Sequence, residues 1–139
     1  MNYKTENQIL EVIEGFESCT IKRDAWGHPE HLIVAYHYSL NNDYETALEK
    51  MRDGIFNLLE TFEVDLKKEM PYHETLTVFW MNTINEYAKG QDGYSVDVVN
   101  KMIENYDKDY PSKFYTRERL FSDEARKTYV EPDLVIKAK

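Results

Sequence analysis

Cysteine is almost absent from this sequence. Cys19 is the only one in 139 residues, which excludes an intrachain disulfide and a zinc site built from several thiolates. Glycine and proline are also scarce, at five and four residues. Where they occur, they interrupt an apolar pattern with helical spacing, so we expect them to mark the ends of elements.

Long hydrophobic runs and an excess of basic charge are missing as well. No stretch approaches the ~18 apolar residues of a membrane span, and the N-terminus lacks the basic and apolar regions of a secretory signal. The 17 Lys and Arg are spread along a chain with 26 Asp and Glu, giving a formal charge of −9. We therefore expect a cytoplasmic protein for which nucleic acid and anionic membranes are poor partners.

Helical periodicity dominates what is present. Hydrophobic residues make up 42% of the chain and charged residues 31%, as in soluble globular domains. No low-complexity tract or composition break divides the chain, so residues 1–139 are predicted to form one domain. Apolar positions three and four apart predict helices over residues 5–18, 28–41, 43–62, 71–90 and 95–106, followed by short pieces over 116–121 and 122–129.

These elements predict an all-α fold. Short connections make consecutive helices antiparallel neighbours, which favours an up-and-down bundle of four long helices. The short fifth helix and a C-terminal helical cap and tail complete it. Asp43 and Ser95 are expected N-caps, and Gly54 is expected either to weaken its helix slightly or to allow close packing.

Two helix starts carry similar histidine-containing sequences. One reads His28-Pro29-Glu30-His31, and the other reads Met70-Pro71-Tyr72-His73-Glu74. Proline suits the first helical position, because its missing N–H has no intrahelical partner there. This places His28 at the N-cap, His31 at the third helical position, and His73 in the first turn of its own helix. In an antiparallel bundle both starts lie at the same end, so these side chains should converge.

A divalent metal site is one hypothesis for this convergence. Three protein ligands with an open position are typical of catalytic zinc, and His28, His31 and His73 are the candidates for zinc, nickel, iron or manganese. Glu74 would be a fourth ligand or a general base in a hydrolase-like reaction. The same residues also suit a metal-free pocket for a small polar molecule.

A structural role for the histidines is the alternative. A histidine near a helix start commonly satisfies backbone donors or packs on a ring. The protein would then be a non-enzymatic interaction module, forming a homodimer through some of its 11 Tyr and 6 Phe. Arg117, Arg119, Arg126 and Lys127 would hold an anionic ligand or pair with the surplus acids.

Three segments, in order, resemble an uncharacterised family of small bacterial helical proteins. The family patterns are W-x-H-x-x-H-L, Y-H-E-T-[IL]-T and Y-[ST]-x-E-R-L-x-S-x-E-A-R, and they match residues 26–32, 72–77 and 115–126. The resemblance covers about residues 16–134 and implies no activity. It marks Trp26, Tyr72, Arg117 and Arg119 as ligand-contact positions, beside the histidines and Glu74. It also implies that the C-terminal tail packs back on the bundle, and Gly27 departs from the threonine often found there.

Overall fold

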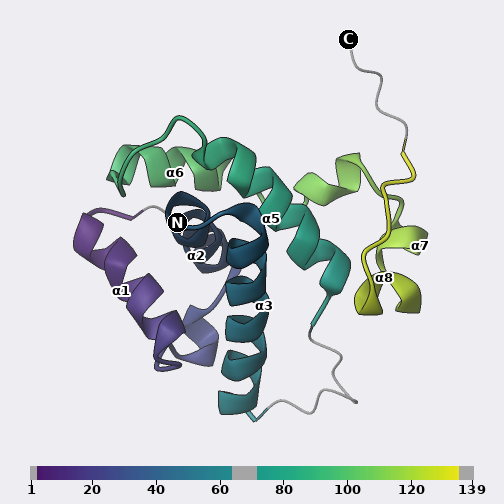
Figure 1. The fold of residues 1–139 in the computed structure, drawn as a ribbon, viewed down its shortest axis with the longest axis horizontal. Helices are drawn as coiled ribbons and strands as arrows, with labels where there is room; N and C mark the ends of the chain where they lie inside the picture. The colour runs from purple at the N-terminus through teal and green to yellow at the C-terminus, as the bar shows by residue number, and fades with distance from the viewer. Residues whose placement is uncertain (1–2, 64–71, 135–139) are drawn as a thin grey trace.

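The computed structural model describes residues 3–63 and 72–134, and within them the fold is all-α, as predicted (Figure 1). No strand occurs in these ranges. The five longer helices are α1 (Glu6–Glu17), α2 (His28–Asn41), α3 (Tyr44–Thr61), α5 (Glu74–Ala88) and α6 (Val96–Asn105). Short elements complete the chain, namely η1 (Arg23–Ala25), η2 (Tyr110–Lys113), α7 (Arg117–Leu120) and α8 (Asp123–Lys127).

The helix starts follow local capping chemistry. The predicted N-caps of α3 and α6 are confirmed: Asp43 Oδ1 accepts from the backbone N–H of Thr46 at 2.8 Å, and Ser95 Oγ accepts from that of Val98 at 3.2 Å. Each bond satisfies one of the N–H groups that have no partner within the helix. The start of α5 differs from the prediction, because the helix begins at Glu74, and Pro71 lies outside the described residues.

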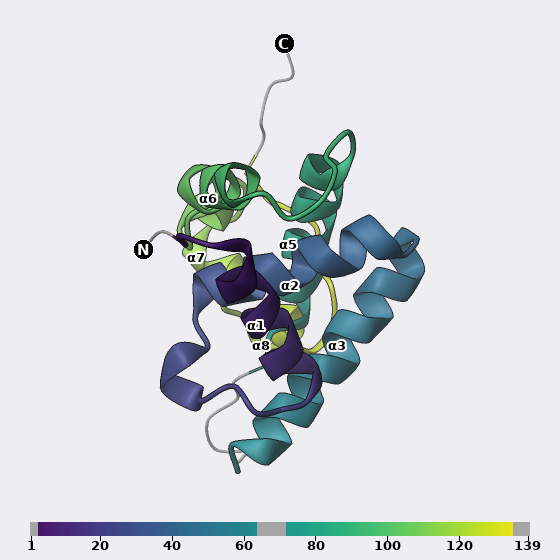
Figure 2. The ribbon, with the colours of Figure 1, turned by 90° about the vertical axis from the view of Figure 1, so that its left-hand side faces the viewer.

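Helix α2 forms the centre of the core. Five consecutive residues of it have no exposed surface, namely Leu32, Ile33, Val34, Ala35 and Tyr36. It packs against α1, α3 and α5, and it crosses them at a steep angle, since Figure 1 views α2 nearly end-on while Figure 2 views it from the side. No helix in the described ranges is both long and apolar enough to cross a membrane.

Gly54 permits a close approach between α1 and α3. A Cβ placed on this residue would lie 2.4 Å from the ring of Phe16, a distance that no real contact tolerates. The Phe16 ring in turn stacks on Trp26 with centroids 5.0 Å apart. The close-packing alternative for Gly54 is therefore confirmed, and it sets the position of Trp26 ahead of α2.

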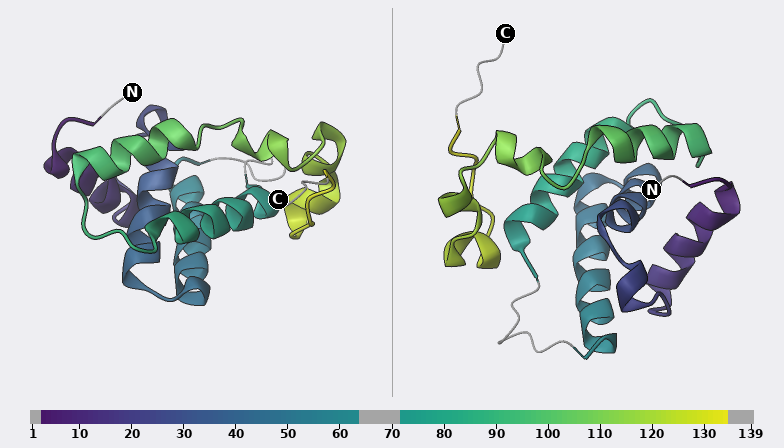
Figure 3. Two further views of the ribbon diagram at one scale, coloured as in Figure 1. Left: turned by 90° about the horizontal axis from the view of Figure 1, so that it is seen from above. Right: turned by 180° about the vertical axis from the view of Figure 1, so that it is seen from behind.

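The C-terminal cap, which comprises α7, α8 and the residues beside them, packs on the start of α5 through α8 (Figure 3). The Thr75 hydroxyl donates to the Thr128 carbonyl at 2.9 Å and accepts from the Val130 N–H at 3.1 Å. The Tyr115 hydroxyl donates to the Val130 carbonyl at 2.7 Å. These bonds are buried or partly buried, so the cap is part of the core structure, and the return of the tail onto the bundle is confirmed.

Candidate functional site

The start of α2 lies one residue earlier than the predicted capping pattern requires. Gly27 is the N-cap, with an extended backbone at φ −131°, and Glu30 is the third helical residue. Glu30 Oε1 reaches back to accept from the Gly27 N–H at 2.9 Å. The predictions of His28 as N-cap and His31 as third residue are therefore wrong, because the glutamate, and not a histidine, caps this helix start.

His28 ties α2 to the end of α6. Its Nε2 lies 2.7 Å from the backbone carbonyl of Tyr106, and a carbonyl only accepts, so Nε2 carries the proton. The imidazole also packs on the Trp80 ring at 4.9 Å. Both contacts hold the helix start in place.

His31 has a different environment. Its ring meets the Trp26 ring edge-on at 5.7 Å, and neither ring nitrogen has a hydrogen-bond partner among residues 3–63 and 72–134. Burial, together with the nearby His28, lowers the pKa of His31 to about 4. The imidazole is therefore uncharged at neutral pH, with one N–H donor and one lone-pair acceptor.

His73 is the N-cap of α5, rather than a residue of its first turn. Its Nδ1 accepts from the Leu76 N–H at 3.1 Å, and its Nε2 lies 2.6 Å from the Leu120 carbonyl, to which it donates. The side chain is buried, and burial lowers its pKa, aided by Arg126 and opposed by the bond to Leu120. The prediction that Pro71 opens this helix misplaced His73, and both of its nitrogens are engaged.

Glu74 lies at the same helix start but faces α3. Its two oxygens accept from Arg52 Nε and Nη2 at 3.1 and 2.6 Å, and Oε1 also accepts from the Tyr72 hydroxyl at 2.5 Å. Burial, with the neighbouring Glu74 carboxylate, raises the pKa of Tyr72 to about 12. The carboxylate predicted as a general base is therefore held in a bidentate ion pair.

One cavity brings several of the predicted residues together. This aromatic cavity has a volume of about 360 Å³. Its walls come from the residue after η1, the first turn of α2, the last turns of α3, the two residues before α5 and the first half of α5. They consist of Trp26, His31, Ile55, Leu59, Tyr72, His73, Leu76, Thr77 and Trp80. Four predicted site residues, Trp26, His31, Tyr72 and His73, thus line it, whereas His28 and Glu74 do not.

The three predicted metal ligands are not brought together as a set. Within the part of the chain that the structure describes, no group of three or more His, Cys, Asp or Glu is placed to hold a metal ion. The reason lies in the hydrogen bonds, since Nε2 of both His28 and His73 is directed at a backbone carbonyl. Only His31 keeps its nitrogens unengaged by described residues.

The predicted arginines lie on the C-terminal cap and do not line the aromatic cavity. Arg119 Nε donates to the Glu131 carbonyl at 2.6 Å. The Arg117 guanidinium packs over the Phe121 ring at 5.7 Å. Both contacts are local to the cap and help to order it.

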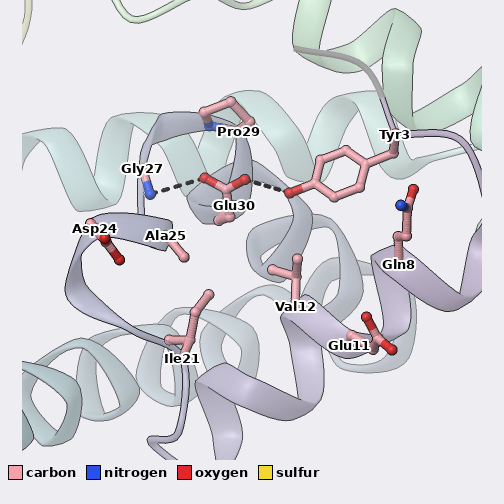
Figure 4. A pocket seen from close by; sticks show the side chains of 10 residues that line it. All are labelled: Tyr3, Gln8, Glu11, Val12, Ile21, Asp24, Ala25, Gly27, Pro29 and Glu30. Carbon is pink, nitrogen blue, oxygen red and sulfur yellow. Dashed lines mark hydrogen bonds between the residues drawn. The ribbon is translucent and has the colours of Figure 1, made fainter.

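A second, larger cavity was missed by sequence reasoning. This acidic cavity, of about 640 Å³, lies between α1, the η1 loop and the first turn of α2 (Figure 4). Its walls are Tyr3, Gln8, Glu11, Val12, Ile21, Asp24, Ala25, Gly27, Pro29 and Glu30. Nothing in the pattern of residues 1–30 signals it, because it depends on Tyr3 reaching Glu30, a contact that helical periodicity does not encode.

Comparisons with known proteins add no family assignment. Models of protein families, curated proteins and solved structures were all compared with this chain, and none matched it. The resemblance to small bacterial proteins therefore stays a prediction.

Proposed function

We propose that this protein binds a small, uncharged, mainly aromatic molecule in the aromatic cavity. The observation that supports this most directly is His31. Its imidazole is neutral, borders the cavity and has no hydrogen-bond partner in the described chain. A ligand hydroxyl or amide that bonds to this imidazole would form a hydrogen bond that the described residues leave unmade.

The walls of the cavity favour a flat ring. Trp26, Tyr72 and Trp80 present aromatic surfaces, and Ile55, Leu59 and Leu76 add aliphatic ones. Aromatic pairs gain about 0.5–1.5 kcal/mol beyond simple area burial. The volume falls at the lower end of small-molecule pockets, so the ligand is expected to be small.

The charge of the ligand follows from the lining. No Asp, Glu, Lys or Arg contributes to the described walls of the aromatic cavity. A charged ligand would be desolvated there without a countercharge, which is costly. An uncharged molecule with one or two polar atoms meets no such penalty.

The same geometry supports binding rather than hydrolase-like catalysis. His73 lines the cavity, yet both of its nitrogens are used in structural hydrogen bonds. The Thr77 hydroxyl donates to the His73 carbonyl at 3.0 Å. The described lining thus holds no pair of nucleophile and base in contact, which acyl-transfer chemistry would require.

A fluorescence titration tests the proposal, because the chain has two tryptophans and both line this cavity. Phenol is the probe, and anisole is its matched partner without the hydroxyl proton. We expect phenol to change the tryptophan emission saturably and to bind roughly tenfold more tightly than anisole, as one additional hydrogen bond would give.

The control for this titration is a pair of variants on α2. His31→Phe should remove the preference for phenol, whereas His37→Phe, outside the cavity, should retain it. If neither phenol nor anisole binds to the wild-type protein, the proposed function is wrong, and if both bind equally, the proposed hydrogen bond to His31 is wrong. Equal preference in His31→Phe and wild type would contradict the role of His31.

A further inference from the structure

The acidic cavity is lined by carboxylates around an apolar floor. Glu11, Asp24 and Glu30 are its acidic residues, and no Lys, Arg or His contributes to its described walls. Its apolar lining residues are Val12, Ile21, Ala25 and Pro29. Figure 4 shows Asp24 and Glu11 on opposite sides, with Glu30 between Pro29 above it and Val12, Ile21 and Ala25 below it.

Glu30 is the most unusual group in this cavity. Its residue is only 7% exposed, yet both of its hydrogen-bond donors are uncharged: the Gly27 N–H and the Tyr3 hydroxyl. No Lys or Arg forms an ion pair with it among the described residues. A buried carboxylate is ordinarily compensated by a positive charge, and none of the described residues forms an ion pair with Glu30.

Tyr3 holds Glu30 in a fixed orientation. Its backbone N–H donates to Asn100 Oδ1 and its carbonyl accepts from Asn100 Nδ2, both at 2.8 Å. One side chain of α6 therefore fixes the backbone of Tyr3. With one donor on each oxygen, the Glu30 carboxylate keeps further lone pairs for a ligand. The site is thus preformed, which lowers the entropy cost of binding.

We propose that the acidic cavity binds an organic ammonium ion, whose charged nitrogen contacts Glu30 and whose hydrocarbon part lies on Val12 and Ile21. A bare metal ion fits less well, because no three of the described carboxylates or histidines converge on one point. The volume of about 640 Å³ is within the usual range for small-molecule sites. This site is separate from the aromatic cavity, so the two proposals stand or fall independently.

Calorimetry with a matched set of six-carbon probes tests this site. Hexylammonium should bind at neutral pH, while hexan-1-ol and hexanoate, which carry no charge or the opposite charge, should not. The ammonium affinity should also fall as salt concentration rises, because ions screen the attraction of the partly exposed carboxylates. The proposal would be overturned if hexan-1-ol bound as tightly as hexylammonium, or if hexylammonium did not bind.

Glu30→Gln removes the charge and keeps much of the shape. It should weaken hexylammonium binding by about tenfold or more, as loss of a charge-assisted hydrogen bond predicts. Glu14→Gln is the control, because it removes one negative charge from α1 at a residue that does not line this cavity. Equal affinity in folded Glu30→Gln and wild type would contradict the role of Glu30.

Ala25→Lys provides a second variant that does not depend on the stability of Glu30→Gln. Ala25 is exposed at the edge of the cavity, so a lysine there would place its own ammonium group beside the carboxylates. Hexylammonium binding should then be lost, whereas Thr20→Lys, exposed on the preceding loop and outside the cavity, should bind as wild type does. Undiminished binding to Ala25→Lys would overturn the proposed location.

Discussion

The starts of α2 and α5 have similar sequences, but they place His31 and His73 in different environments. At α5, His73 engages both ring nitrogens, and Glu74 accepts from Arg52 and Tyr72, so the described polar groups are used to join α5, α3 and the C-terminal cap. At α2, His31 faces the aromatic cavity without a hydrogen bond to the described chain. The position of a histidine beside a helix start therefore does not determine its role, because the neighbouring elements decide whether its nitrogens are hydrogen-bonded or accessible.

Matched substitutions should separate the two starts most strongly. His73→Phe leaves the Leu76 N–H and the Leu120 carbonyl without partners, so we expect it to lower the free energy of unfolding by about 3 kcal/mol. His31→Phe keeps a ring beside Trp26 and removes no hydrogen bond to residues 3–63 or 72–134, so it should change stability by less than about 1 kcal/mol. Urea unfolding measures both, and similar losses would refute the comparison.

Acid should destabilise the protein through its histidines. Burial lowers the pKa values of His31, His37 and His73 in the folded state. Above the unfolded pKa of about 6.5 both states are neutral, and below it only the unfolded state takes up protons, so stability is lost as the pH falls.

The His31 part of this loss is the largest that we can assign. With a folded pKa of about 4, it reaches about 3 kcal/mol by pH 4. Chemical unfolding at a series of pH values measures it, and His31→Phe should flatten the curve between pH values of about 6.5 and 4. A variant curve parallel to that of wild type would show that His31 does not stay neutral.

Gly54→Ala should test the packing between α1 and α3 that positions Trp26 ahead of α2. The new Cβ would meet the Phe16 ring at 2.4 Å. The destabilisation from this overpacking, about 1–3 kcal/mol, should outweigh the stabilisation of up to about 1 kcal/mol that alanine gives a helix relative to glycine. We expect a lower melting temperature and altered Trp26 fluorescence. Asp53→Ala, exposed on the same helix, should show neither change, and a stabilised Gly54→Ala would contradict the close approach.

The ion pair at the α5 start should contribute least. Arg52→Gln breaks a bidentate contact whose two side chains are 35% and 15% exposed. Because solvent screens such a pair, we expect a loss of about 1 kcal/mol, and less at high salt. A loss as large as that of His73→Phe would mean that Glu74, rather than His73, dominates this helix start.

Much of the fold could be predicted from local sequence. The all-α class, the approximate helix limits and the N-caps Asp43 and Ser95 follow from 3.6-residue periodicity and short-range hydrogen bonding. Helix starts were less predictable where two capping solutions compete. At α2 the glutamate at position 30 reached back to Gly27, which moved both histidines by one position relative to the prediction.

The candidate site was harder to predict than the fold, because it depends on contacts between residues that are distant in the sequence. That His31 and His73 line one cavity agrees with the expected convergence of the two starts. That the Nε2 atoms of His28 and His73 are directed at the carbonyls of Tyr106 and Leu120 could not be foreseen, since those carbonyls lie 78 and 47 residues away along the chain. Tyr3 and Glu30 likewise meet across 27 residues, which hid the acidic cavity.

The most direct test of the contrast between His31 and His73 is a pH titration of the imidazole ¹⁵N shifts by NMR. We predict that His73 holds a single tautomer with the proton on Nε2, and that its shifts do not respond to phenol. His31 should stay neutral until the pH approaches about 4, and phenol should shift its nitrogens at neutral pH. A His31 that titrates near its ordinary pKa and ignores phenol would contradict the account.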